Sequence, residues 1–111
     1  MKGDVLLIDF PFSEGGGSKV RPALSVQGNA VRSVNTIIAQ ITSNLARLGT
    51  PTRLFIDIAV ETGCGLVTNS VVMCDNLYTI HNGRIIRTLG SLSSAAMVRI
   101  DDYLKAAHGV P

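Results

Sequence analysis

The distribution of apolar and polar residues predicts a chain of short β-strands followed by one helix. Runs rich in β-branched and other apolar residues alternate with clusters of Gly, Pro, Asn and Ser, a pattern typical of strands separated by turns. The predicted strands cover residues 5–10, 23–26, 36–41, 53–58, 70–74, 76–80 and 84–89. Strands this short favour a small barrel-like sheet.

Two connections between these strands have distinctive turn chemistry. Residues 11–20 begin with a proline and include three consecutive glycines, which order at a high cost in backbone entropy and pack little surface. This composition predicts a mobile surface loop. Asn82-Gly83 is the dipeptide most typical of a two-residue β-hairpin, so we expect the strands on either side of it to pair.

The apolar period becomes helical near the C-terminus. The positions that share one predicted helix face are Ala96, Met97, Ile100, Leu104 and Ala107, and charged residues occupy the other face. Ser93 is the expected N-cap, Leu92 and Met97 flank it as a hydrophobic staple, and Gly109 suits the C-terminal stop. We therefore expect one amphipathic helix at the end of the chain.

Length and composition narrow the class of protein. A chain of 111 residues, 46% of them hydrophobic, is expected to form a single folded domain over residues 1–111. Asp4 and Asp9 interrupt the sequence where a signal peptide needs an apolar run, and no stretch approaches the ~18 apolar residues of a membrane span. We expect a cytoplasmic protein with no membrane partner.

The cysteines and histidines do not have the spacing of a metal site or a disulfide framework. Cys64 and Cys74 are the only two cysteines and form no CxxC motif, and the chain has only two histidines. We expect reduced cysteines with packing roles, and chemistry that needs no metal or other cofactor.

The basic residues are unevenly distributed although the net charge is only +2. No acidic residue lies between Glu14 and Asp57, whereas five basic residues do: Lys19, Arg21, Arg32, Arg47 and Arg53. Such an interval either forms a face that attracts phosphate groups or is neutralised by acids from elsewhere in the fold. With no Trp and 5% aromatic residues, a surface built on base-stacking platforms is not expected.

Polar side chains at predicted strand ends are the candidates for chemistry. Arg21 lies between the glycine loop and a strand, where it holds phosphate oxygens or is an ordinary surface arginine. Thr42 and Ser43 end an apolar strand, where hydroxyls either donate to phosphate or bond to the backbone, and the residues alone favour the second role. Asp75 ends another apolar run and either takes a proton or accepts turn amides.

The order and spacing of several blocks resemble the MazF/PemK/Kid family of toxin endoribonucleases. The blocks, which span Gly3 to about Leu104, are GDVLLIDFPF, a glycine-rich loop, VRPALSVQ, TIIAQITS, PTR, SVVMCDNLYTI, GRIIRTLGSL and MVRIDDYL. The resemblance implies a mainly β fold with a C-terminal helix, in the form of a small SH3-like barrel, and a homodimer. It also implies a cognate antitoxin and metal-independent, sequence-specific cleavage of single-stranded mRNA that leaves a cyclic phosphate and a 5′-hydroxyl.

The same resemblance assigns roles to individual residues. Arg21 of the RP motif and Thr42 of the ITS motif match the family's catalytic arginine and hydroxyl residue. Asp75 matches an aspartate that some members use with an arginine two residues earlier, a position that is Met73 here, so Asp75 is a catalytic or positioning candidate. RNA binding is expected at Gly17, Lys19, Ser43, Asn76 and Tyr78.

A second function on the same fold is binding of DNA gyrase without catalysis, as in CcdB-like toxins. Those toxins depend on a C-terminal Trp-Gly-Ile ending. This chain ends in His108-Gly109-Val110-Pro111 and contains no Trp, so RNA cleavage is the favoured prediction.

Overall fold

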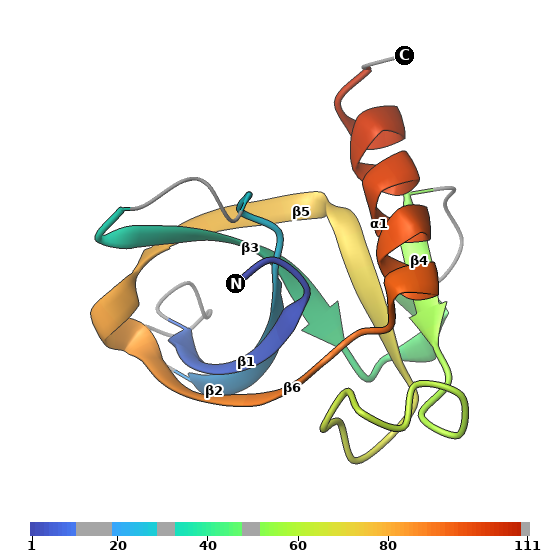
Figure 1. Cartoon of the computed structure of the whole chain (residues 1–111), viewed down its shortest axis with the longest axis horizontal. Helices are drawn as coiled ribbons and strands as arrows, with labels where there is room; N and C mark the ends of the chain where they lie inside the picture. Colours follow the sequence, from blue (N-terminus) through green and yellow to red (C-terminus); the bar gives the residue numbers. More distant parts are fainter. Residues whose placement is uncertain (11–18, 29–32, 48–51, 110–111) are drawn as a thin grey trace.

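The computed structural model describes residues 1–10, 19–28, 33–47 and 52–109. In these residues six antiparallel strands form a strongly curled sheet in the order β4-β5-β3-β2-β1-β6, followed by a helix (Figure 1). The elements are β1 (Asp4–Phe10), β2 (Lys19–Ser25), β3 (Asn35–Thr42), β4 (Arg53–Ile56), β5 (Ser70–His81), β6 (Ile85–Ser91) and α1 (Ser94–Ala107), with 3₁₀ turns η1 (Leu45–Arg47) and η2 (Asn82–Arg84). The predicted mainly β fold with a C-terminal helix is confirmed, and the barrel is open because its edge strands β4 and β6 do not pair within the described ranges.

Two apolar clusters fill the fold. The residues of the first cluster are Leu6, Ile8, Phe10, Ala23, Ile38 and Ile80. The larger second cluster includes α1 residues, and α1 contacts β4 and β5 (Figure 1). Because neighbouring residues of a strand point to opposite faces, β1 contributes Val5 to one cluster and Leu6 to the other. Cys64 and Cys74 are buried in the second cluster and are not bonded to each other, which confirms their predicted packing role.

The C-terminal helix has the predicted ends. The Ser93 hydroxyl accepts a hydrogen bond from the Ala96 amide at 3.1 Å, and Gly109 follows the helix with a φ of +67°, where glycine is favoured. Ile100 is fully buried and faces the second cluster, as its spacing indicates. No helix of the described ranges is long and apolar enough to cross a membrane.

The two strands predicted over residues 70–80 are a single strand, β5. Its pairing with β3 jumps from Ala39↔Leu77 to Gln40↔Met73, so three residues of β5 have no partner on β3 at that point. The Cys74 amide instead donates to the Thr52 carbonyl at 2.9 Å. Asp75, the one residue between the two predicted strands, therefore lies in a bulge, which bends a strand without ending it.

The hairpin predicted at Asn82-Gly83 is wrong. β6 pairs with β1, and β5 and β6 are not neighbours in the sheet. A two-residue hairpin of this kind needs positive φ at both positions, and neither residue has it. The chain forms the η2 turn instead, in which His81 Nδ1 accepts a hydrogen bond from the Gly83 amide at 2.9 Å.

Two strand ends also differ from their predicted positions. β4 ends at Ile56 rather than residue 58, because the Asp57 carboxylate accepts the Ala59 amide at 2.9 Å and the Ile58 amide donates to the Asn69 side chain at 3.0 Å. β2 begins at Lys19 rather than residue 23. Arg21, expected before the strand, therefore lies within it.

Candidate active site

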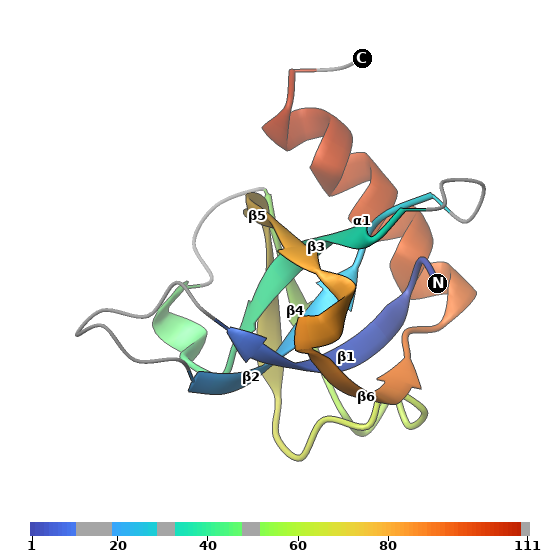
Figure 2. The ribbon, with the colours of Figure 1, turned by 90° about the vertical axis from the view of Figure 1, so that its left-hand side faces the viewer.

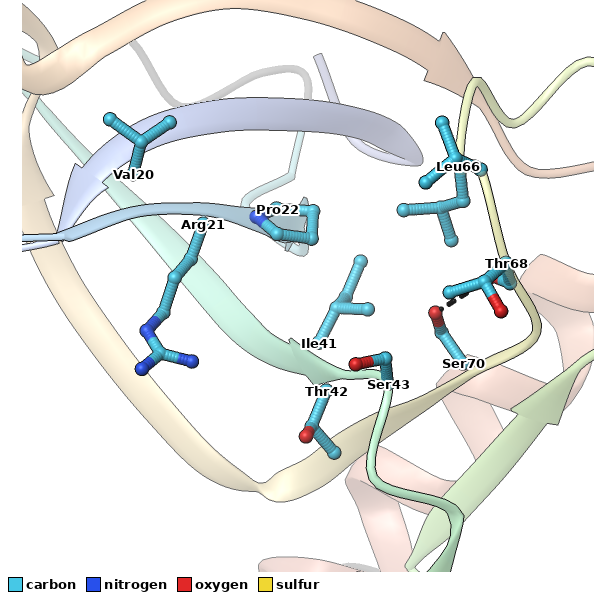
Figure 3. Close-up of a pocket in the computed structure, with 10 residues that line it drawn as sticks. Val20, Arg21, Pro22, Ile41, Thr42, Ser43, Leu66, Thr68 and Ser70 are labelled. Carbon is cyan, nitrogen blue, oxygen red and sulfur yellow. Dashed lines mark hydrogen bonds between the residues drawn. The ribbon is translucent and has the colours of Figure 1, made fainter.

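A pocket lies where the pairing of β2 with β3 ends. The two strands pair from Ala23↔Gln40 to Ser25↔Ile38, and the next pair in this register would join Pro22 to Ile41. Proline has no amide hydrogen to extend the ladder. The pocket, of about 270 Å³, is lined by Val20, Arg21, Pro22, Ile41, Thr42, Ser43, Leu66, Val67, Thr68 and Ser70 (Figure 3).

Arg21 and Thr42 come together in this pocket from neighbouring strands. Arg21 is held in β2 opposite Ile8 of β1 and is partly buried, whereas Thr42 is the last residue of β3. In Figure 3 both side chains extend from their strands toward the same side, with Ser43 beside them. The described residues that line the pocket include no carboxylate, so the arginine gives the pocket a positive potential suited to an anion.

Thr42 makes the strand-terminating bond that its position predicts. Its Oγ1 accepts a hydrogen bond from the Asn44 amide at 3.1 Å. A hydroxyl has one hydrogen and two lone pairs, so this bond fixes the oxygen without using its hydrogen. The side chain is therefore positioned by the backbone and able to donate to a ligand.

Asp75 is paired with an arginine from another strand. Arg53 Nε and Nη2 donate to the two Asp75 carboxylate oxygens, each at 3.2 Å. Arg53 lies directly opposite Met73 in the β4–β5 register, and Met73 itself is only 5% exposed. Asp75 is therefore paired with an arginine from the adjacent strand and not with one at position 73, and sequence analysis did not find this pair because the partners are 22 residues apart in the chain.

This contact sets the protonation behaviour of Asp75. The hydrogen bonds from Arg53 lower the pKa of the Asp75 carboxyl below its ordinary value of 3.8. A lowered pKa weakens a carboxylate as a proton acceptor near neutral pH. The geometry therefore favours a positioning role for Asp75 over general-base catalysis.

For the RNA cleavage that the resemblance implies, we expect Asp75→Asn to lower the rate about 10–100-fold, corresponding to about 1.4–2.7 kcal/mol, because Arg53 loses the ion pair that orients it. Arg53→Met is expected to give a similar loss, and the double variant no further loss, measured as single-turnover cleavage of one short RNA. Additive losses, or an Asp75→Asn variant as inactive as one lacking Arg21, would contradict the positioning role.

The Arg53–Asp75 pair also makes the free energy of unfolding depend on pH in a predictable direction. Because the pKa of Asp75 is lowered in the folded state, its ionised form adds to the free energy of unfolding. This stabilisation is complete above the ordinary pKa of 3.8 and is lost as the pH falls through the lowered value. The pair is partly exposed, so this contribution is at most about 1 kcal/mol at neutral pH.

Lys19, Asp75, Asn76 and Tyr78, unlike Ser43, are not among the described residues that line this pocket. The Asn76 side-chain amide (Nδ2) donates to Gln40 Oε1 at 2.8 Å, and the Tyr78 ring packs edge-on against Phe10 with centroids 5.0 Å apart. Lys19 is exposed at the start of β2, two residues from Arg21. Gly17 and most of the glycine-rich loop lie outside the described residues, as do Arg32 and the side chain of Arg47.

Sequence analysis missed one wall of the pocket. Leu66, Val67 and Thr68 belong to the segment between β4 and β5, which no motif distinguished. Its sequence holds two glycines, Gly63 and Gly65, and these are the sole local signal of a close backbone approach. Among the described residues, no three His, Cys, Asp or Glu side chains gather into a possible metal site.

A comparison with protein-family models matches residues 1–108 to PemK-like, MazF-like toxins of type II toxin-antitoxin systems. The chain belongs to this toxin family. The match spans nearly the whole sequence and confirms the resemblance carried by the separate motifs. It does not favour the CcdB-like alternative. A comparison with curated protein sequences finds no match.

Solved structures of MazF-like toxins share the fold of this PemK-like chain. Mycobacterium tuberculosis toxin MazF-mt6 has a TM-score of 0.79 at 25% identity, over 97% of this chain and 98% of that one. An endoribonuclease from a mycobacterial species, solved with its cognate antitoxin, has a TM-score of 0.79 at 23% identity, over 100% and 96% of the two chains. A MazE-MazF structure from Deinococcus radiodurans has a TM-score of 0.75 at 18% identity, over 99% and 95%. The curled sheet with its C-terminal helix is thus the MazF-like toxin fold.

Proposed function

We propose that this PemK-like toxin is an endoribonuclease that cleaves single-stranded mRNA in the cytoplasm at short sequence motifs. The observation that carries the proposal is that Arg21 and the Thr42 hydroxyl line one pocket, whose described lining residues include no carboxylate. An arginine beside a hydroxyl donor suits a phosphodiester group, because both donate to phosphoryl oxygens. The similarity to structures described as endoribonucleases supports the same activity.

The proposed reaction is an internal transesterification. The ribose 2′-oxygen attacks the adjacent phosphorus and loses its proton, and the bond from phosphorus to the 5′-oxygen breaks as that oxygen gains a proton. The products are a 2′,3′-cyclic phosphate and a 5′-hydroxyl. Arg21 stabilises the added charge on the phosphoryl oxygens, and Thr42 donates a further hydrogen bond and fixes the phosphate for in-line attack.

The decisive experiment incubates the purified protein with a long single-stranded RNA in EDTA. Cleavage with the two product ends described above is expected, and the same sequence made as DNA is expected to stay intact because it lacks the 2′-hydroxyl. An intact RNA, or cleavage that depends on a divalent cation, contradicts the proposal. Gyrase-dependent DNA breaks would instead indicate the CcdB-like function.

We further propose that the protein works as a homodimer and is silenced by a cognate antitoxin. The antitoxin is supported by two similar structures that were solved with an antitoxin or with MazE, whereas the homodimer rests on the family resemblance. Sedimentation of the free protein is expected to give the mass of two chains, and the co-expressed antitoxin is expected to suppress RNA cleavage. A monomer at micromolar concentration contradicts the dimer.

Thr42→Val is expected to lower cleavage about 100-fold, because valine keeps the shape of threonine and removes the hydroxyl donor. Stability should fall by only about 1 kcal/mol from the loss of the bond to the Asn44 amide. Thr36→Val is the matched control: Thr36 lies on the same strand and its hydroxyl donates to Asn82, away from the pocket. Single-turnover rates near those of the wild type for Thr42→Val would refute the catalytic role.

A further inference from the structure

The segment between β4 and β5, residues 57–69, is held firmly to its neighbours; we refer to it as the pocket loop. Its Glu61 carboxylate accepts both the amide and the hydroxyl of Ser93, each at 2.7 Å, at the N-terminus of α1. The Gly63 carbonyl accepts the Ser91 amide at 3.0 Å. These bonds tie the loop to the helix and to β6.

A second feature of the pocket loop is its close contact with the backbone of β6. A Cβ on Gly65 would lie 2.1 Å from the Leu89 carbonyl oxygen, and one on Gly90 would lie 2.2 Å from the Gly63 carbonyl oxygen. Two glycines therefore allow loop and strand to pack backbone against backbone. At the far end, the Ser70 hydroxyl donates to the Thr68 carbonyl at 3.0 Å (Figure 3).

This anchored loop presents an exposed apolar side chain at the candidate active site. Val67 is 93% exposed and lines the pocket that contains Arg21 and Thr42. A single exposed valine is ordinary on a protein surface. Val67 differs from such a residue because its loop is bonded to α1 and β6 and because it lines a pocket that contains an arginine. It therefore presents an apolar side chain next to a site suited to an anion.

We propose that Val67 is a contact surface for the unpaired nucleobase next to the scissile phosphate, and that it takes part in selecting the cleavage site. This rests on the proposed RNA cleavage. A nucleotide joins an anion to a flat apolar ring, and the pocket offers the matching pair, a guanidinium on β2 and apolar side chains on the pocket loop. The pocket volume of about 270 Å³ lies below the roughly 300–1,000 Å³ of drug-sized sites, which suits part of one nucleotide.

The contact requires single-stranded RNA. In a duplex the faces of the bases are stacked on one another and are not available to a side chain, whereas unpaired bases can be turned outward. Valine has no hydrogen-bonding group, so it selects by shape and apolar contact, and the neighbouring Thr68 hydroxyl is placed to meet a polar edge of the base.

The test compares Val67→Ser with Val34→Ser. Val34 is also an exposed valine, at 67%, and it precedes the start of β3, whereas Thr42 is the last residue of that strand. The course of β3 can be followed in Figure 2. We expect Val67→Ser to change the nucleotides that flank the cut sites on a long RNA and to lower kcat/KM about 10-fold at the wild-type sites, mainly through KM. Val34→Ser is expected to match the wild type, and both variants to keep its thermal stability.

A binding measurement separates this inference from the proposed activity. The probe is a single-stranded oligonucleotide with 2′-deoxy sugars, which the proposed reaction cannot cleave. The methyl signals of Val67 in the NMR spectrum are expected to shift when this strand is added, and not when the same strand is in a duplex. The methyl signals of Val34 are expected to stay unchanged in both cases. RNA cleavage by the wild type together with unshifted Val67 methyls and unchanged cut sites overturns the inference alone, as expected if Val67 serves a protein partner. Failure of the wild type to cleave overturns the proposed function and with it the selection of a cleavage site, and the methyl shifts then test only the contact between Val67 and an unpaired base.

Discussion

Replacing Arg21 by alanine is expected to reduce RNA cleavage by about 10³-fold or more while leaving the fold intact. Arg21 is the one cation among the described residues that line the pocket, and no acid in that set offsets it. In phosphoryl transfer the largest protein contribution is stabilisation of charge on the phosphoryl oxygens, and loss of one such donor costs about 10²–10³-fold or, for an arginine, more.

The measurement is single-turnover cleavage of a short RNA, with thermal unfolding recorded for each variant. Arg21→Lys keeps the charge but loses the planar, two-pronged geometry, so we expect an intermediate rate. Arg99→Ala is the matched control, because Arg99 lies on α1 and bonds to Tyr103 at 3.3 Å rather than lining this pocket. A drop in thermal stability as large as that of a core variant would show that Arg21 is structural.

Gly65→Ala is expected to destabilise the fold by about 3 kcal/mol or more, which lowers Tm by about 10 °C or more. Gly65 has a φ of +75°, and its added Cβ would lie 2.1 Å from the oxygen and 2.5 Å from the carbonyl carbon of Leu89. Both are backbone atoms of β6, so the strand or the pocket loop has to move. Because this loop carries Val67 into the pocket, RNA cleavage is expected to fall as well.

Gly109→Ala separates backbone strain from the close approach to β6 as causes of the stability lost in Gly65→Ala. Gly109 has a similar φ of +67°, but an added Cβ there would meet nothing within 4 Å. Backbone strain alone is worth about 1–2 kcal/mol, so this variant is expected to be much less destabilised than Gly65→Ala. Equal losses of unfolding free energy in the two variants would mean that the close approach to β6 has no energetic weight.

The sequence by itself determined the elements whose signals are local. The caps of α1 depend on Ser93 and Gly109, which act on backbone groups within a few residues, and the apolar period of the helix follows from its own geometry. The blocks around Arg21-Pro22 and Thr42-Ser43 also identified the toxin family without any knowledge of the fold.

Only the tertiary structure decided which residues meet. The Asn82-Gly83 dipeptide predicted a hairpin, but β6 pairs with β1, and this pairing overrides a turn preference worth far less than a strand interface. Arg53 reaches Asp75 across the β4–β5 register, and the pocket loop, bonded to Ser91 and Ser93, places Val67 in the lining of the pocket that contains Arg21. These partners are separated by 22 or more residues, and such contacts are stable only after the sheet has curled, so no local pattern in the sequence encodes them.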